Sequence, residues 1–188
     1  MKNKMSVEEF LAEFARQSQT SESQAYAYAK EIGESKTLLS PQTRQCALCR
    51  YAIGLFYNAR YEEAEKILKS FAFDYEKYPF KSFYVDALSV LGLIQYYKQR
   101  YHLSIFYAGQ AVSLAQEKKC SDRLAGLYSN LAAPYRELGE NARSLAYLDR
   151  SLQYASASLE PNVKARLLYN RTAILMSLER YSEARETI

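Results

Sequence analysis

The feature that most constrains this chain is a repeat with a period of about 40 residues. Stepping along the sequence by this period aligns large apolar residues with one another and, four positions later, small residues. The aligned sets are Leu48, Leu88, Tyr128 and Leu168, and then Ala52, Gly92, Ala132 and Thr172. In the second half of each unit Tyr61, Tyr101 and Tyr181 are aligned, with Asn141 as the exception. The small residues Ala64, Ser104, Ser144 and Ala184 follow three positions later. Repeats of this length bury their apolar faces against neighbouring repeats, which predicts a solenoid.

Each unit is predicted to contain two antiparallel helices. The chain has only 6 Gly and 4 Pro, which is few for a fold rich in turns. Residues typical of helix starts lie at the beginning of each unit: Ser40 with Pro41 before the first, Pro79 before the second, Ser121 as the cap of the third, and Pro161 at the start of the fourth. Gly139 is suited to the C-terminal end of the first helix of the third unit. We therefore expect an all-α fold of stacked helix pairs.

The domain organisation follows from the repeat. Residues 39–188 hold four units, at about 41–78, 79–119, 120–159 and 160–188. Residues 1–38 follow the repeat only loosely, and the capping box in Ser6-Val7-Glu8-Glu9 predicts an atypical helical hairpin that caps the array. The fourth unit stops inside its second helix, whereas arrays usually end in a polar capping helix. We therefore expect the N-terminal part of a longer protein, and a reading frame that ends at Ile188 would contradict this.

The pattern resembles the tetratricopeptide-repeat (TPR) family. The segments of this chain that carry the resemblance are Leu91-Gly92, Leu131-Ala132, Tyr61-Glu62-Glu63-Ala64 and Tyr181-Ser182-Glu183-Ala184. The resemblance covers residues 41–188 and implies a right-handed α-α superhelical solenoid. The usual TPR period is about 34 residues, so the longer period here implies longer helices. It is similar to the period of regulatory arrays in bacterial signalling proteins. HEAT-like repeats have similar periods and are the alternative.

In TPR arrays the first helix of each pair lines a concave groove, so the resemblance implies a protein or peptide ligand there. The predicted lining residues are Arg50, Phe56, Ser89, Tyr96, Ser129, Asn130, Arg136, Arg166, Tyr169 and Asn170, and Cys46 and Cys49 are placed on the same face. Asn130 and Asn170 are the strongest candidates, because an amide pairs with both the N–H and the C=O of an extended peptide. The alternative is a bond to a neighbouring helix. Arg136 and Arg166 are candidates for holding a carboxylate or an acidic segment of a partner. The alternative for both is a solvated face with a local glutamate, such as Glu137 beside Arg136.

Composition and charge argue against several classes of function. The net charge is +4, and the 25 basic and 21 acidic residues are interspersed. The sequence lacks a basic stripe with interleaved aromatic residues, so it does not predict nucleic-acid binding. The longest apolar run, around Leu88 to Ile94, is too short to span a bilayer. The acidic pair Glu8-Glu9 argues against a secretory signal core. Three Cys, an odd number, indicate a reducing compartment, so we expect a cytoplasmic protein.

No set of residues predicts catalysis. Cys46 and Cys49 form a C-x-x-C pair, but zinc needs about four ligands, and the other candidates, Cys120 and His102, lie far along the chain. Redox activity favours a cysteine at a helix N-terminus, whereas this pair is predicted a turn or more inside a helix. Gly54 and Gly92 are predicted to be helix-packing glycines rather than parts of a phosphate loop. We expect no cofactor, no metal and no enzymatic activity.

The sequence therefore predicts a non-catalytic module that binds a protein or peptide, without a nucleic-acid or membrane partner. A homodimer through the uncapped C-terminal repeat is a further expectation. The alternative is the sensory or regulatory arm of a bacterial signalling enzyme, such as a GGDEF diguanylate cyclase, or of a transcription regulator. In that case the output domain would lie beyond residue 188.

Overall fold

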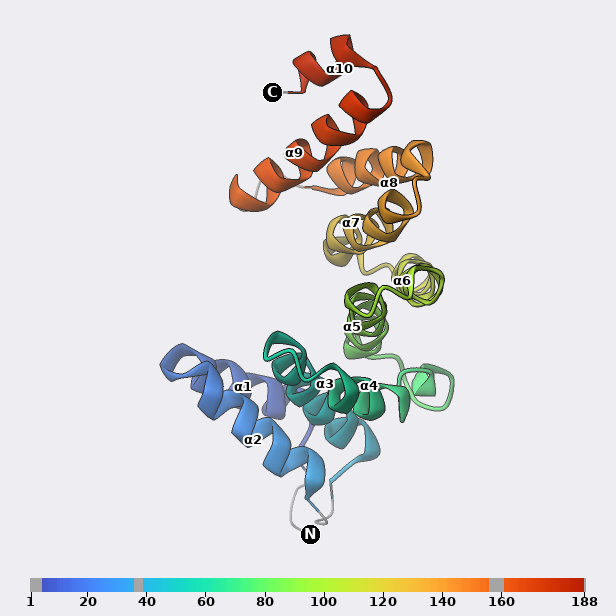
Figure 1. Cartoon of the computed structure of the whole chain (residues 1–188). Coiled ribbons are helices and arrows are strands. Elements are labelled where there is room, and N and C mark those ends of the chain that lie inside the picture. The colour runs from blue at the N-terminus through green and yellow to red at the C-terminus, as the bar shows by residue number, and fades with distance from the viewer. Residues whose placement is uncertain (1–4, 36–38, 156–160, 188) are drawn as a thin grey trace. The chain divides into compact units, whose positions relative to one another are not determined.

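The computed structural model describes residues 5–35, 39–155 and 161–187, and every regular element in these ranges is a helix (Figure 1). The α-helices are α1 (Val7–Thr20), α2 (Glu22–Glu34), α3 (Pro41–Tyr57), α4 (Tyr61–Lys69), α5 (Phe83–Tyr97), α6 (Tyr101–Glu117), α7 (Ser121–Glu137), α8 (Asn141–Tyr154), α9 (Pro161–Ser177) and α10 (Tyr181–Glu186). A short 3₁₀ helix, η1 (Asp74–Glu76), precedes α5. The chain divides into two compact units, residues 1–90 and 91–188, and α5 contributes to both. The prediction of an all-α chain is confirmed.

The two helix starts with the clearest sequence signals are confirmed. Ser40 is the N-cap of α3, and its Oγ accepts a hydrogen bond from the backbone N–H of Thr43 at 3.0 Å. Pro41 is the first helical residue, where its missing N–H costs nothing. Ser6 and Glu9 form the capping box of α1, with reciprocal N···O distances of 3.1 and 2.7 Å. Local side-chain chemistry therefore sets both starts.

The prediction that Ser121 caps the third unit is wrong. Ser121 is the first residue of α7, and the cap position belongs to Cys120, which makes no side-chain capping bond. The reason lies in the preceding turn, where the Cys120 N–H donates to the Ala115 carbonyl at 2.8 Å. Lys119 adopts a left-handed φ of 57° to allow this bond. The end of α6 thus fixes where α7 begins.

The turn inside each helix pair has the same conformation in all four repeats. The left-handed residues are Ala59, Gln99, Gly139 and Glu179, with φ between 57° and 75°, and they occupy the same register of successive repeats. In each turn the following N–H donates to the carbonyl five positions earlier, as Arg60 does to Leu55 at 2.9 Å. This Schellman arrangement satisfies the last carbonyls of a helix. The period of the sequence is therefore also a period of the backbone.

Gln99→Gly is expected to stabilise the protein, and Gly139→Ala to destabilise it. A left-handed φ costs a residue with a side chain roughly 1 kcal/mol, a cost that glycine avoids. The expected change in the free energy of unfolding is about 0.5–1 kcal/mol in each case, measured by urea unfolding. Gly109→Ala is the control with opposite sign, because Gly109 lies inside α6 with open space around an added Cβ. If Gly109→Ala and Gly139→Ala shift stability alike, backbone conformation is not the cause.

In the first unit, α1 and α2 form a hairpin that packs on α3. The Phe10 side chain is fully buried, and its ring stacks on Tyr28 with the centroids 5.7 Å apart. α2 approaches α3 at Gly54, where an added Cβ would lie 2.6 Å from the Tyr26 ring. Gly54 is therefore a helix-packing glycine, as predicted, because only a hydrogen leaves room for the tyrosine.

The first repeat differs from the expectation that both helices are lengthened. α3 has 17 residues, but α4 has only 9, and the chain continues through η1 before α5 begins. Phe71 and Phe83 are both buried across this connection, with ring centroids 6.2 Å apart. The extra residues of this repeat thus form a connection anchored by aromatic packing instead of a longer helix.

The second unit contains α6 to α10 and the C-terminal half of α5. Gly92 of α5 lies against α6, where an added Cβ would be 3.2 Å from the backbone nitrogen of Ala108. At the equivalent crossing of α7 and α8, the Ser144 hydroxyl donates to the Ala132 carbonyl at 2.8 Å. Small residues therefore allow the two helices of a pair to approach closely, as the repeat predicts.

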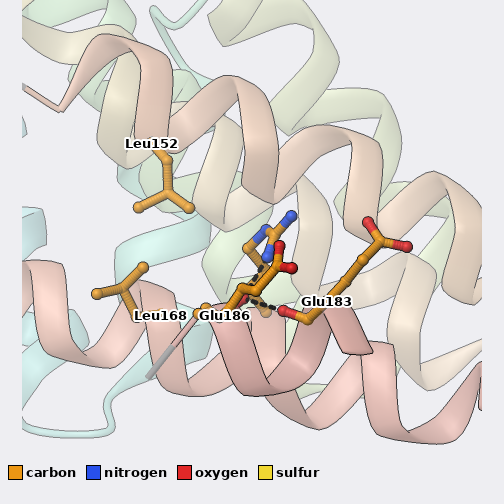
Figure 2. Close-up of a pocket in the computed structure, with 6 residues that line it drawn as sticks. Leu152, Leu168, Glu183 and Glu186 are labelled. Atoms are coloured by element: carbon orange, nitrogen blue, oxygen red, sulfur yellow. Dashed lines mark hydrogen bonds between the residues drawn. The ribbon is translucent and has the colours of Figure 1, made fainter. Parts of the chain in front are cut away.

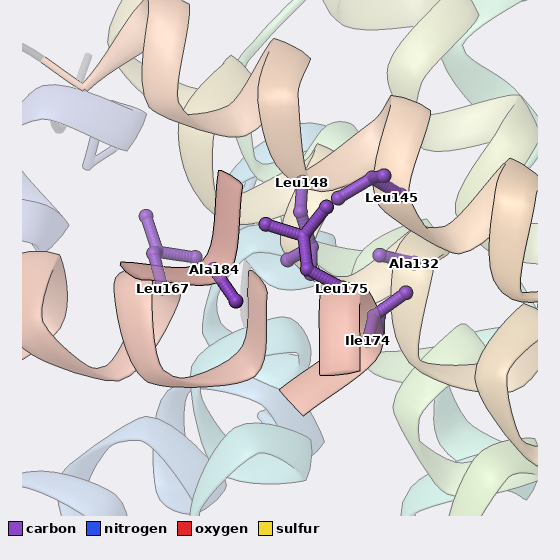
Figure 3. Packing of buried hydrophobic residues seen from close by; sticks show 7 residues of the cluster. All are labelled: Ala132, Leu145, Leu148, Leu167, Ile174, Leu175 and Ala184. Atoms are coloured by element: carbon purple, nitrogen blue, oxygen red, sulfur yellow. The ribbon is translucent and has the colours of Figure 1, made fainter. Parts of the chain in front are cut away.

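One core cluster joins α7, α8, α9 and α10 (Figure 3). Its buried members are Ala132, Leu145, Leu148, Leu167, Ile174, Leu175 and Ala184. Because they come from two consecutive helix pairs, the pairs share one core, and neither buries its apolar face alone.

Candidate functional site

The predicted binding face lies on α3, α5, α7 and α9, the first helices of the four pairs. Arg50, Phe56 and Ser89 belong to the first unit, and the other seven predicted residues belong to the second. The predicted residues thus form two groups, one on each unit.

In the first unit, α5 covers part of this face of α3. An Arg50 nitrogen lies 3.6 Å from a carboxylate oxygen of Asp86 on α5. The Cys49 thiol donates to the Phe83 carbonyl of α5 at 3.5 Å. Cys46 and Cys49 are both fully buried. Their placement on a groove surface is therefore wrong, because both side chains are buried and α5 contacts Cys49.

Phe56 and Ser89 are also partly covered in the first unit. The Phe56 ring packs against Tyr57 and Tyr61, with centroid distances of 5.4 and 5.7 Å. Ser89 of α5 is half-buried and takes part in an interaction of its own. These positions of the first unit therefore offer limited open surface.

In the second unit, Tyr96 and Arg136 meet at Glu137. The Tyr96 hydroxyl on α5 donates to Glu137 Oε1 on α7 at 3.1 Å, and Arg136 Nη2 donates to the same oxygen at 2.9 Å. The hydrogen bond from Arg136 lowers the pKa of Glu137, and the same bond raises the pKa of Arg136. Arg136 thus forms the ion pair that was the alternative to binding a ligand carboxylate.

The remaining predicted residues are Ser129 and Asn130 on α7 and Arg166, Tyr169 and Asn170 on α9. Ser129, Asn130 and Asn170 are half-buried, and Asn130 already takes part in an interaction within the protein. Arg166 is exposed, and Tyr169 is 74% exposed. The predicted positions on α9 therefore present more open surface than those on α7.

A stack of four tyrosines on α7 and α8 was missed by sequence reasoning. Tyr135 stacks on Tyr147, Tyr147 on Tyr128, and Tyr128 on Tyr154, with centroid distances of 5.4, 6.2 and 5.6 Å. The Arg150 guanidinium lies 5.8 Å from the Tyr128 centroid. The available signal was the seven-residue spacing on each helix, which places both tyrosines on one face. Because the rings stack on one another, they stabilise the α7–α8 pair.

A cavity of about 350 Å³ lies between α8, α9 and α10 (Figure 2). Its lining residues are Leu152, Leu168, Arg171, Glu183, Glu186 and Thr187. Arg171 Nε donates to Asp149 at 2.7 Å, and Arg171 Nη1 donates to the Thr187 hydroxyl. The cation of this cavity is therefore already held by the protein itself, which makes it a poor anchor for an anionic ligand.

Both cysteines of the C-x-x-C pair are fully buried. Burial raises the pKa of the Cys46 thiol to about 12, and a protonated thiol is a poor nucleophile and metal ligand. All three cysteines are thiols, not disulfides. Over the described ranges, no group of three or more His, Cys, Asp or Glu side chains is arranged to hold a metal ion. We therefore interpret the pair as part of the α3 packing.

Cys46 and Cys49 are expected to resist alkylation while the protein is folded. Iodoacetamide needs both access and a thiolate, so the partly exposed Cys120 should react first. Cys46 and Cys49 should react only when urea unfolds the chain, and peptide mass spectrometry gives the order. Native-state modification of Cys46 at the rate of Cys120 would show that this face of α3 opens.

Among the described helices, none combines the length and the apolar character needed to cross a membrane.

Known proteins resemble this chain in fold. No family model matches the sequence, and no curated protein matches it either. The crystal structure of BtubC (BKLC) from P. vanneervenii aligns with a TM-score of 0.77 at 15% identity, over 97% of this chain and 76% of that one. An ArsTM double mutant of MamA RS-1 aligns with a TM-score of 0.66 at 14% identity, over 96% of this chain and 89% of that one. Both have helical-repeat, TPR-like folds, so the prediction of an all-α solenoid is confirmed.

Proposed function

We propose that this chain is a non-catalytic protein-interaction module of the TPR type. The observation that carries the proposal is the face of α7 and α9, where amide, hydroxyl, aromatic and cationic side chains stand half-buried or exposed. Helical repeats present extended surfaces of this kind to their partners. The helical-repeat fold supports the same conclusion.

The proposed array comprises four TPR-type repeats within residues 39–188, preceded by a capping hairpin in residues 1–38. Two features support this division: the left-handed turn between the two helices of a pair recurs in each repeat, and small residues lie at the crossings Gly92–Ala108 and Ala132–Ser144. We also propose a cytoplasmic location, because three thiols suit a reducing compartment.

Asn130 and Asn170 are the residues that we propose contact an extended segment of the partner. They occupy equivalent positions of α7 and α9, separated by one repeat period. Each amide can offer a donor and an acceptor to a peptide backbone. Ser129 lies beside them, whereas Arg136 is the weaker candidate because Glu137 already holds it.

The double variant Asn130→Ala with Asn170→Ala is expected to weaken peptide binding by about 10- to 100-fold. Each lost amide removes hydrogen bonding with a net value of about 0.5–1.5 kcal/mol, so the two together account for about 1–3 kcal/mol. The probes are short peptides selected from a random display library on the unchanged chain, with affinity measured by fluorescence anisotropy. Asn58→Ala, an exposed amide at the end of α3, is the matched control. Unchanged binding at unchanged stability would refute the role of both amides.

A further inference from the structure

The start of each second helix carries a charge that the fold usually pairs. The N-cap residues of α4, α6, α8 and α10 are Arg60, Arg100, Glu140 and Arg180. In three of these helices the N-cap residue forms an ion pair with the residue three positions later. The pairs, each with an N···O distance of 2.6 Å, are Arg60 with Glu63, Glu140 with Arg143, and Arg180 with Glu183. In α6 the equivalent position holds Leu103, so Arg100 lacks this partner.

Arg100 and the apolar residues after it lie on an exposed side of α6. Arg100 is exposed, and among the residues that the structure describes its guanidinium has no ion-pair or hydrogen-bond partner. Leu103 is 47% exposed, and Phe106, one turn further along, is 50% exposed. The equivalent positions on α4 and α8 are also exposed, and they hold Glu63, Lys66, Arg143 and Ala146. Since this register faces solvent in each helix and α6 lies in the middle of the chain, the exposure of Leu103 and Phe106 is not caused by a chain end.

The outward side of α6 is uncharged along most of its length. From Tyr101 to Gln116 the helix contains no Asp, Glu, Lys or Arg. The residues at helical spacing on this side, here called the α6 face, are Leu103, Phe106, Gly109, Gln110 and Ser113. Beyond them lies Glu117, whose side chain is 66% exposed and pairs with the adjacent Lys118, a surface contact that leaves the carboxylate accessible. The α6 face thus has a cation at its start, a carboxylate at its end, and apolar or neutral residues between them.

Two copies of the α6 face complement each other when the helices run antiparallel. The midpoint of residues 100 and 117 lies between residues 108 and 109, so a two-fold axis beside Gly109 brings Arg100 of each copy to Glu117 of the other. Gly109 has no side chain, and an added Cβ there would meet nothing within 4 Å. The two backbones can therefore approach closely at the axis, where Phe106 of each copy would pack beside Gly109 of the other.

We propose that two copies of this chain form a symmetric dimer through antiparallel α6 helices. Arg100 pairs with Glu117 of the other copy at both ends, and Leu103 and Phe106 of each copy are buried between these pairs. The second copy thus supplies the carboxylate that α6 itself does not offer to Arg100, and opposes no like charges. One helix per copy buries less than the about 1,200 Å² of a stable complex, so the dimer forms at micromolar or higher concentrations. Dimerisation goes beyond the proposed function, because α6 carries none of the residues proposed to bind a peptide.

The first test measures the oligomeric state of the full chain by sedimentation velocity, from micromolar to millimolar concentration. We expect a monomer–dimer equilibrium that Phe106→Glu weakens at least about 10-fold, because the substitution places two carboxylates near the axis. Ala146→Glu is the matched control, since Ala146 is the exposed equivalent of Phe106 on α8. Urea unfolding should give the same stability for both variants, because both positions are exposed. A monomer at every concentration, or equal weakening by the two substitutions, would overturn the inference.

The second test exchanges the two charges that the dimer pairs. Arg100→Glu and Glu117→Arg each bring like charges together, and each is expected to weaken the dimer about 10-fold. The double variant restores opposite charges at both ends and should dimerise as the unchanged chain does. An equimolar mixture of the two single variants should form a heterodimer for the same reason. Both substitutions suit the dipole of α6, so a loss of helix stability does not explain weaker association. If the double variant is as weak as the single variants, Arg100 does not meet Glu117 and the inference fails.

Two further outcomes separate this inference from its rivals. A dimer that persists in Phe106→Glu and is lost in Tyr169→Glu would assign association to the C-terminal repeat, as the sequence predicts, and would overturn pairing through α6. Phe106→Glu should bind library-selected peptides as tightly as the unchanged chain, because Asn130 and Asn170 lie on α7 and α9. A chain that stays monomeric while its peptide binding depends on these two amides overturns the inference and leaves the proposed function standing.

Discussion

Leu175→Ala is expected to lower the free energy of unfolding by about 2–5 kcal/mol. Leu175 is fully buried in the cluster that joins α7 to α10, together with Leu145, Leu148 and Ala184 (Figure 3). The substitution removes apolar contacts from two helix pairs at once. The α7–α8 crossing is fixed by the hydrogen bond from Ser144 to the Ala132 carbonyl, so these helices cannot easily close the resulting cavity. Urea unfolding followed by circular dichroism measures the change.

The neighbouring residue supplies the control for this prediction. Met176 is 51% exposed, and Met176→Ala is expected to cost less than about 1 kcal/mol. The two substitutions remove side chains of similar size from adjacent positions of α9 and differ mainly in burial. Similar losses for both would mean that the cluster around Leu175 does not hold the second unit together.

Gln95→Leu is expected to raise the free energy of unfolding, whereas Leu175→Ala lowers it. Gln95 occupies the position equivalent to Leu175, two periods earlier in the sequence. It is fully buried, and neither its Oε1 nor its Nε2 has a hydrogen-bond partner in the described part of the chain. An unpaired buried amide costs about 1–3 kcal/mol. Replacing it with leucine should therefore raise the free energy of unfolding by about that amount, measured as for Leu175.

Two companion variants isolate the role of the amide. Gln95→Ala removes the amide without filling its volume, so its gain should be smaller than that of Gln95→Leu. Gln153→Leu, on the exposed surface of α8, should stay within about 0.5 kcal/mol of the unchanged protein. If Gln95→Leu lowers stability, the amide must be hydrogen-bonded in the folded protein.

Much of the fold follows from local and periodic signals. α3, α4, α6, α8, α9 and α10 begin at Pro41, Tyr61, Tyr101, Asn141, Pro161 and Tyr181, where caps, prolines or the repeat position them. Such signals act over a few residues and are visible in one sequence. The short α4 and the 3₁₀ helix after it were not predictable in this way. Burial of Phe71 against Phe83 decides the conformation there, and that contact lies between distant residues.

The candidate site was less predictable than the fold. Register correctly identifies equivalent positions, but it does not say which of them a neighbour covers. Cys49 and Tyr169 share one register, yet Cys49 is fully buried and Tyr169 is 74% exposed. The ion pair of Arg136 was readable because Glu137 is adjacent in sequence. The hydrogen bond from Tyr96 to the same carboxylate spans 41 residues and depends on how α5 and α7 pack.

The recurring left-handed turn makes the helix pairs interchangeable at their joints. Residues 59, 99, 139 and 179 share one backbone conformation and one hydrogen-bond pattern. A deletion that joins residue 99 directly to residue 140 therefore connects two segments that already adopt this turn. The same holds for a chain in which one unit is duplicated between two such turns. Recombination at these joints changes the length of the array by whole units and requires no new connection. Modular growth, and the transfer of single units between related arrays, is thus built into the backbone.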